Sequence, residues 1–196
     1  MRTLIIFLSF ITVSSIGFIA CSGNISQAEA APAAALTHDS LVNRGSYLVS
    51  TIGCDDCHSP KRMGAHGPEV IPELRLSGFT KGGILPPVDT AAVKKGWALF
   101  SPDLTAAVGP WGISYAANIT SDVTGIGSWT EMQFIKAIRE GKSKGLDNTR
   151  RMLPPMPWFN FAKLTDTDLK AIYAFLQSTK PVENAVPAPV PPNEIK

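Results

Sequence analysis

The sequence predicts a mainly α-helical domain that is interrupted by one long, loop-rich insertion. Three segments carry helix signals, with apolar side chains at helical spacing behind a capping residue: 39–52, 130–140 and 165–180. Between the first two, residues 59–117 contain seven prolines and many glycines but no helical period, so short strands or turns are expected there. The pentapeptide Cys54–His58 links the first helix to this loop-rich segment, of which the insertion is 69–117.

Composition and charge narrow the class of function. The chain has 196 residues, which suits one domain of ordinary size with terminal additions. We place the domain at 39–182 and expect the Pro-rich residues 183–196 to form a loose tail. The net charge is +2, charged residues make up 17% of the chain, and lysine and arginine do not cluster. These features exclude a nucleic-acid-binding protein.

The N-terminus predicts export and lipidation. Residues 4–20 form an uncharged apolar run, as in a signal-peptide core or a short membrane span. The stretch Phe-Ile-Ala-Cys that ends at Cys21 resembles a bacterial lipobox, in which cleavage precedes the cysteine and the thiol is lipidated. We therefore expect a lipoprotein signal peptide at 1–20 and a membrane anchor on Cys21, on the periplasmic or another extracytoplasmic face. An ordinary cleaved signal or an uncleaved anchor is the alternative. Residues 21–38, rich in Ala, Ser and Pro, predict a flexible tether.

The first helix has a predicted cap and a predicted buried face. Asp39 and Ser40 are the expected capping residues. The apolar positions share one face of a 3.6-residue period: Leu41, Leu48, Val49 and Ile52. Gly45 lies on the same face, and because glycine lowers helix stability, its presence there indicates close approach by another element.

The second and third helices carry clear boundary signals. Thr130 with Gln133 three residues later forms a capping box, and Gly141 is placed to end that helix. Thr165 is the predicted cap of the last helix, and Pro181 ends it.

The pentapeptide Cys54-Asp-Asp-Cys57-His58 has the spacing of a c-type haem attachment site. Two thiols at this separation can add to the two vinyl groups of one porphyrin edge, and the imidazole next in the chain can reach the iron. A zinc site is the first alternative, but adjacent cysteine and histidine would be strained on one ion and no second cysteine pair exists. A redox-active Cys-x-x-Cys lacks the surrounding βαβ pattern.

The second axial ligand is predicted to be Met156. Prolines flank it on both sides and restrict the backbone that would present its thioether. Met152 is the second candidate, and Met63 lies too close to the cysteines to reach the opposite haem face easily. His38 and His66 are rival ligands that we expect to be solvated surface groups. A His/Met pair would raise the potential and close the iron to small ligands.

With these motifs in place, residues from about 41 to 181 resemble a mono-haem class I cytochrome c domain. The likeness is greatest to the cytochrome c modules of bacterial membrane-bound alcohol and sugar-acid dehydrogenases. Four stretches carry it, in the family's order: Cys-Asp-Asp-Cys-His at 54–58, the segment 118–129 that begins Asn-Ile-Thr-Ser-Asp, Pro-Pro-Met-Pro-Trp at 154–158, and the segment 164–176. The insertion at 69–117 exceeds a minimal domain of this family.

The resemblance implies a cytochrome c-like helical fold around one covalent haem c. It implies thioether bonds at Cys54 and Cys57, His58 as the proximal iron ligand and Met156 as the distal one.

The same resemblance implies roles for three further positions. The Pro68 carbonyl would accept a hydrogen bond from the proximal imidazole, with Pro60 as the alternative. Gly45 and Tyr173 would lie where the first and last helices cross.

The expected function is single-electron transfer between a donor dehydrogenase or quinol-oxidising complex and a terminal acceptor. The chain itself is not expected to be an enzyme, and its redox partners should bind transiently. Two alternatives are a haem enzyme or ligand sensor with a displaceable sixth ligand, and a dedicated haem subunit of one dehydrogenase or oxidase complex.

Overall fold

The computed structural model describes residues 36–195. The predicted signal peptide, the lipidation site Cys21 and nearly all of the tether lie outside these residues. Within 36–195, no helix combines the length and the apolar character needed to cross a bilayer.

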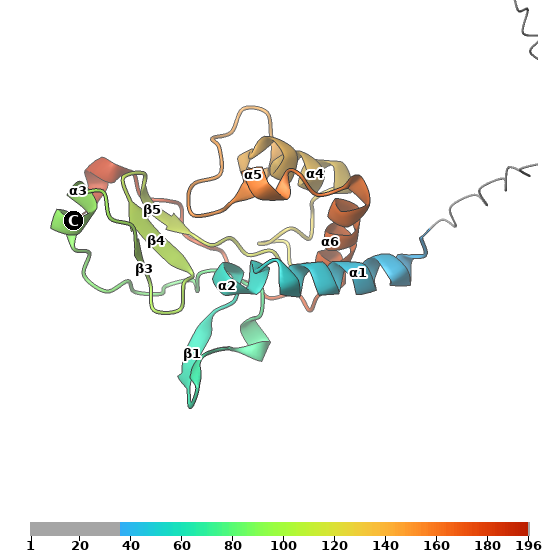
Figure 1. Ribbon diagram of the computed structural model, residues 1–196, viewed down its shortest axis with the longest axis horizontal. Helices are drawn as coiled ribbons and strands as arrows, with labels where there is room; N and C mark the ends of the chain where they lie inside the picture. Colours follow the sequence, from blue (N-terminus) through green and yellow to red (C-terminus); the bar gives the residue numbers. More distant parts are fainter. Residues whose placement is uncertain (1–35, 196) are drawn as a thin grey trace, which may run out of the picture. The chain divides into compact units, whose positions relative to one another are not determined.

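The described residues form a helical core and, in the stretch of sequence between the second and fourth helices, two small antiparallel sheets (Figure 1). The helices are α1 (His38–Thr51), α2 (Cys54–His58), α3 (Thr90–Lys94), α4 (Glu131–Glu140), α5 (Trp158–Phe161) and α6 (Asp166–Ser178). The strands are β1 (Lys61–Gly64), β2 (Gly67–Val70), β3 (Leu99–Phe100), β4 (Ala106–Gly109) and β5 (Gly112–Tyr115). Short 3-10 turns lie at Pro72–Leu74, Ser143–Gly145 and Pro192–Glu194.

The helix starts agree with the capping signals in two cases and differ in one. Thr130 and Thr165 cap α4 and α6, and each side-chain oxygen accepts a hydrogen bond from the backbone N–H three residues on. The cap predicted for α1 is wrong, because Thr37 Oγ1 accepts from the N–H of Ser40 at 3.2 Å and Asp39 lies in the first turn. The capping box of α4 is only half formed, because the side chain of Gln133 donates to the Lys144 carbonyl instead.

Helices α1 and α6 cross at Gly45. A Cβ atom at this position would lie 1.9 Å from the Ala171 carbonyl oxygen and 2.7 Å from Cβ of Phe175. Only glycine therefore allows this contact. Tyr173 was expected at the same crossing, but its ring packs on Phe134 of α4, with centroids 5.7 Å apart, and its hydroxyl donates to the Trp129 carbonyl at 2.6 Å.

The main core lies among α1, α4 and α6. Its buried residues are apolar and come from these helices and from two neighbouring loops: Val49, Leu76, Ile126, Phe134, Ile138, Leu169, Ile172 and Leu176. Arg44 of α1 and Asp168 of α6 add an ion pair beside the crossing, with Nε and Oδ1 2.6 Å apart.

The insertion holds most of the β structure. Strands β1 and β2 form a hairpin, and β3, β4 and β5 form a second antiparallel sheet in which β4 is buried throughout. One five-residue helix, α3, lies where the sequence shows no helical period. Its Asp89 cap accepts from the N–H of Ala92 at 2.9 Å.

The C-terminal segment packs against the domain, so the expectation of a loose tail is wrong. Asn184 is only 6% exposed, and its side chain donates to the carbonyls of Ser77 and Phe79 at 2.7 and 2.9 Å. Further on, Val190 pairs with Ile113 of β5 through two backbone hydrogen bonds.

Candidate haem site

The two cysteines and the histidine of the motif lie on helix α2. Gly53 precedes this helix with φ 83°, a left-handed conformation that turns the chain sharply after α1. Cys54, Cys57 and His58 are all half-buried. Cys54 also packs against the main core. The local sequence therefore brings both thiols and the imidazole onto one short helix at the edge of the core.

The His58 ring is fixed by a backbone carbonyl. Its Nδ1 lies 2.7 Å from the carbonyl oxygen of Ala117. A carbonyl only accepts, so Nδ1 carries the proton and Nε2 keeps its lone pair. Burial lowers the pKa of His58, which favours the neutral ring. A neutral imidazole with a free Nε2 is the form that binds a metal.

The acceptor for His58 corrects the prediction made for Pro68. Pro68 lies in β2 opposite Met63, on the exposed hairpin. Ala117 reaches the ring because 76–79 and 116–119 run side by side: Gly78 N–H donates to the His58 carbonyl at 2.7 Å, and Phe79 N–H donates to the Ala116 carbonyl at 2.9 Å. A backbone carbonyl 59 positions away leaves no side-chain signal in the sequence.

The cysteines have the properties of neutral thiols. Burial, with a smaller contribution from the charge of Asp55, raises the pKa of Cys54 to about 12. Burial also raises the pKa of Cys57. A redox-active cysteine needs a lowered thiol pKa, which neither Cys54 nor Cys57 has. Within residues 36–195, no three His, Cys, Asp or Glu side chains come together as a metal cluster. The structure therefore supports neither alternative for this motif.

Asp55, inside the motif, is tied to the loop after β2. Its carboxylate accepts from Arg75 Nε and Nη2 at 3.0 and 2.7 Å and from Ser59 Oγ at 2.7 Å. Burial opposes ionisation of Asp55, but these hydrogen bonds outweigh it and hold the pKa below its usual value. Ser59 Oγ also accepts from the N–H of Leu76 at 2.9 Å. The network fixes α2 against the core, and neither Arg75 nor Ser59 was predicted from sequence.

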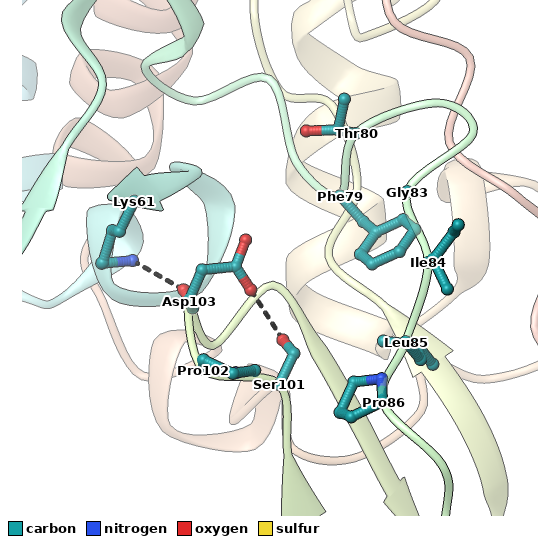
Figure 2. Close-up of a pocket in the computed structure, with 10 residues that line it drawn as sticks. All are labelled: Lys61, Phe79, Thr80, Gly83, Ile84, Leu85, Pro86, Ser101, Pro102 and Asp103. Atoms are coloured by element: carbon teal, nitrogen blue, oxygen red, sulfur yellow. Dashed lines mark hydrogen bonds between the residues drawn. The ribbon is translucent and has the colours of Figure 1, made fainter. Parts of the chain in front are cut away.

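Lys61 connects the end of α2 to the insertion. Its Nζ lies within hydrogen-bond distance of four carbonyl oxygens, on Asp55, Asp56, Ser59 and Asp103, at 2.7–3.1 Å. Figure 2 shows the contact with Asp103, whose carboxylate accepts from Ser101 Oγ at 2.7 Å. Lys61, Ser101 and Asp103 line one side of a surface pocket of about 230 Å³. Phe79 and Ile84–Pro86 line the other side.

The structure separates the methionines of residues 36–195 by their exposure. Met63 and Met132 are 74% and 81% exposed. Met152 and Met156 both pack against the same core as Cys54. The rival ligands His38 and His66 are exposed. Of the methionines in residues 36–195, only Met152 and Met156 therefore pack against the core that Cys54 also contacts.

The donors fit a haem with two axial ligands. One neutral imidazole is oriented by a backbone hydrogen bond, and two methionine side chains pack against the same core cluster as Cys54. Imidazole nitrogen with thioether sulfur is the ligand pair of cytochromes c. Fold and site thus define a helical domain built to hold one covalent haem.

Proteins with this fold and site form a recognised sequence family. The cytochrome c family pattern matches residues 42–180. The chain belongs to the cytochrome c family.

Curated relatives carry the same domain. The chain is 33% identical over 150 residues to the gluconate 2-dehydrogenase cytochrome c subunit of Pantoea cypripedii, covering 76% of this chain and 25% of that protein. It is 31% identical over 159 residues to the fructose dehydrogenase cytochrome subunit of Gluconobacter japonicus, covering 80% and 25%. The cytochrome c subunit of the quinone-dependent alcohol dehydrogenase of Gluconobacter oxydans is 29% identical over 171 residues, which are 86% of this chain and 27% of that protein.

The chain spans about a quarter of the length of these three relatives. The match therefore covers the cytochrome c domain and not the rest of these relatives. This domain binds a covalent haem c and functions in electron transfer.

Proposed function

We propose that Cys54 and Cys57 carry the two thioether bonds and that His58 and Met156 hold the iron from opposite faces. Each thiol adds its sulfur to one vinyl carbon and its hydrogen to the other. When bound, the haem supplies the Fe(III)/Fe(II) couple. The observation that carries the proposal is the 2.7 Å contact between His58 Nδ1 and the Ala117 carbonyl, since it leaves Nε2 to bind a metal.

The protein side chains favour electron transfer over substrate chemistry. A thioether opposite the imidazole raises the potential and occupies the position that an oxygen or small ligand would need. The contacts of Asp55 and Lys61 hold α2 at both ends, so the ring of His58 is supported in one orientation. A rigid site limits rearrangement when the charge changes by one unit.

The physiological role that we propose is single-electron transfer from a dehydrogenase or quinol-oxidising complex to a terminal acceptor, without substrate turnover by this chain. The relatives named as subunits of gluconate and fructose dehydrogenases favour a dehydrogenase as the donor. They also favour a second candidate, a dedicated haem subunit of one complex. Purification of the native protein separates the two, because a dedicated subunit co-purifies at fixed stoichiometry and a shuttle does not.

We also propose that the domain is held at an extracytoplasmic membrane face by lipid on Cys21. The support is the sequence up to this residue, which resembles a lipobox. Two or three acyl chains would give stable attachment, since each buried methylene contributes about 0.8 kcal/mol. Mass spectrometry of the mature N-terminus should find an acylated cysteine. A mature chain that begins elsewhere would reject the anchor and leave the haem proposal intact.

The ligand proposal is tested with two matched variants, Met156→Ala and Met152→Ala. Both residues are half-buried and pack against the same core, so loss of packing is similar in the two. Met156→Ala should abolish the weak far-red band that sulfur ligation gives the oxidised protein, and it should lower the potential. Met152→Ala should keep both. The reverse pattern would assign the ligand to Met152, and no change in either variant would remove methionine from the site.

A further inference from the structure

The segment that carries Met156 is fixed at its two ends but has little support of its own. At one end, the N–H of Met152 donates to the Gly141 carbonyl at 2.7 Å. At the other, Trp158 opens α5 and its ring lies so close to Gly141 that a Cβ there would be 2.4 Å away. Between them, three of the five residues 153–157 are prolines, which have no N–H to donate.

One hydrogen bond holds the middle of this segment. Ser114 Oγ, on strand β5, donates to the Pro154 carbonyl at 2.6 Å. Among residues 36–195, it is the only hydrogen bond that joins 153–157 to any residue outside 152–162. The Ser114 residue is 8% exposed, so water cannot easily replace its hydroxyl.

The neighbours of Ser114 direct its proton to Pro154. Trp111 Nε1 donates to Ser114 Oγ at 3.2 Å, which uses one acceptor position of the hydroxyl. The competing acceptor, the Ala107 carbonyl, lies farther away at 3.3 Å. A serine hydroxyl has one proton, and the 2.6 Å contact to Pro154 is the shorter and stronger of the two.

The same strand also reaches the other proposed ligand. The chain leaves β5 at Tyr115, and two residues later the Ala117 carbonyl accepts from His58 Nδ1. The segment 114–117 thus contacts the imidazole of His58 and the segment of Met156. A strand of the insertion therefore spans the two sides of the site.

We infer that Ser114 is a positioning residue that keeps the Met156 segment closed over the iron. The inference rests on the proposed ligation by Met156. In the closed state Met156 is bound to the iron, and without the Ser114 hydroxyl the Pro154 carbonyl then has lost its hydrogen-bond partner. In the open state the segment has moved away with Met156 detached, and the same carbonyl can bond to water. The population in which Met156 is detached should then rise roughly 5–30-fold, as expected from the loss of one such bond.

Imidazole titration of the oxidised full-length holoprotein measures this population. Imidazole binds iron only when the methionine is detached, so its apparent Kd falls in proportion to the rise in the open fraction. Ser114→Ala should therefore bind imidazole roughly 5–30-fold more tightly than the wild type. Ser101→Ala is the control, since Ser101 is also 8% exposed and bonds only to residues of its own turn, Asp103 and Ala106. Its imidazole affinity should stay within about twofold of the wild type.

The outcomes separate this inference from the ligand proposal. Equal imidazole affinities for Ser114→Ala, Ser101→Ala and the wild type would overturn the role of Ser114. Ligation by Met156 would still stand if the oxidised protein shows the far-red band. A wild-type protein without that band would overturn both. If Ser114→Ala does not yield holoprotein, the isosteric pair Ser114→Thr and Ser114→Val decides. Thr keeps the hydroxyl and should retain weak imidazole binding, whereas equal affinity in the two would refute the inference.

Discussion

Replacing Gly45 by alanine tests the packing that positions α1 and, through it, the cysteine helix. The new Cβ would lie 1.9 Å from the oxygen and 2.6 Å from the carbon of the Ala171 carbonyl. Both are backbone atoms of α6 and cannot rotate away. Because ordinary contact begins near 3.4 Å, the helices must separate locally by about 1.5 Å. Overpacking costs about 1–3 kcal/mol, and alanine regains about 1 kcal/mol of helix propensity. We expect a net loss of about 2 kcal/mol, from the upper end of that range.

The assay is denaturant unfolding of the oxidised holoprotein, followed by circular dichroism and by the haem absorbance. Asn43→Ala is the control, because Asn43 is an exposed position of the same helix. It should be neutral or slightly stabilising, since alanine is the better helix former. If Gly45→Ala unfolds within about 0.5 kcal/mol of the wild type, the close crossing of α1 and α6 is refuted.

Two further changes test the ion pair at the crossing and the C-terminal segment. Burial raises the pKa of Asp168, but hydrogen bonds from Thr165 and Arg44 outweigh it and the net pKa is lowered. Its stabilising effect is therefore present above the unfolded value of about 3.9 and lost as the pH falls through the folded value. Asp168→Asn should cost about 1–2 kcal/mol at pH 7, and pH-dependent unfolding should show the difference from the wild type shrinking in acid; a constant difference would contradict this. Asn184→Ala removes three hydrogen bonds to residues 77–81 and should lower the free energy of unfolding by about 1–3 kcal/mol. It should also expose the C-terminal segment to proteases. Asn193 is exposed, so Asn193→Ala should change neither the stability nor the protease sensitivity.

Local signals in the sequence predicted the three longest helices, α1, α4 and α6. Thr130 and Thr165 were identified as caps because a cap depends on a hydroxyl and an N–H only three residues apart. Gly45 was assigned to a close approach because glycine on an apolar helix face lowers helix stability unless a neighbouring element needs the space. The cap of α1 failed because three nearby residues, Thr37, Asp39 and Ser40, can all cap and the sequence does not rank them.

Long-range backbone contacts could not be predicted in the same way. The acceptor for His58 is a main-chain oxygen of Ala117, and any residue type could supply it. Likewise, Ser114 stands 40 positions from Pro154 in a strand with no chemical motif. The C-terminal segment looked loose because its prolines lack periodicity, yet Asn184 and Val190 both fix it through main-chain partners. Such contacts depend on how the insertion folds, which composition does not determine.

The insertion therefore has a structural role in the site. Two of its residues contact His58: the Gly78 N–H donates to the main-chain carbonyl of His58, and the Ala117 carbonyl accepts from the His58 ring. Lys61 and Asp103 add a second connection to the cysteine helix. We expect a change at Ser114 of β5 to alter the haem environment although this strand lies outside the haem-binding motif.

The proposed electron transfer requires a haem whose iron is closed on both faces. The optical spectrum of the wild-type holoprotein in both oxidation states, recorded with and without carbon monoxide, shows whether it is closed. If His58 and Met156 occupy both axial positions as proposed, the spectrum should show one low-spin haem in each state and no change of the reduced protein under carbon monoxide. Formation of a carbon monoxide complex, or a high-spin spectrum in either state, would contradict it and favour a ligand-binding or catalytic haem.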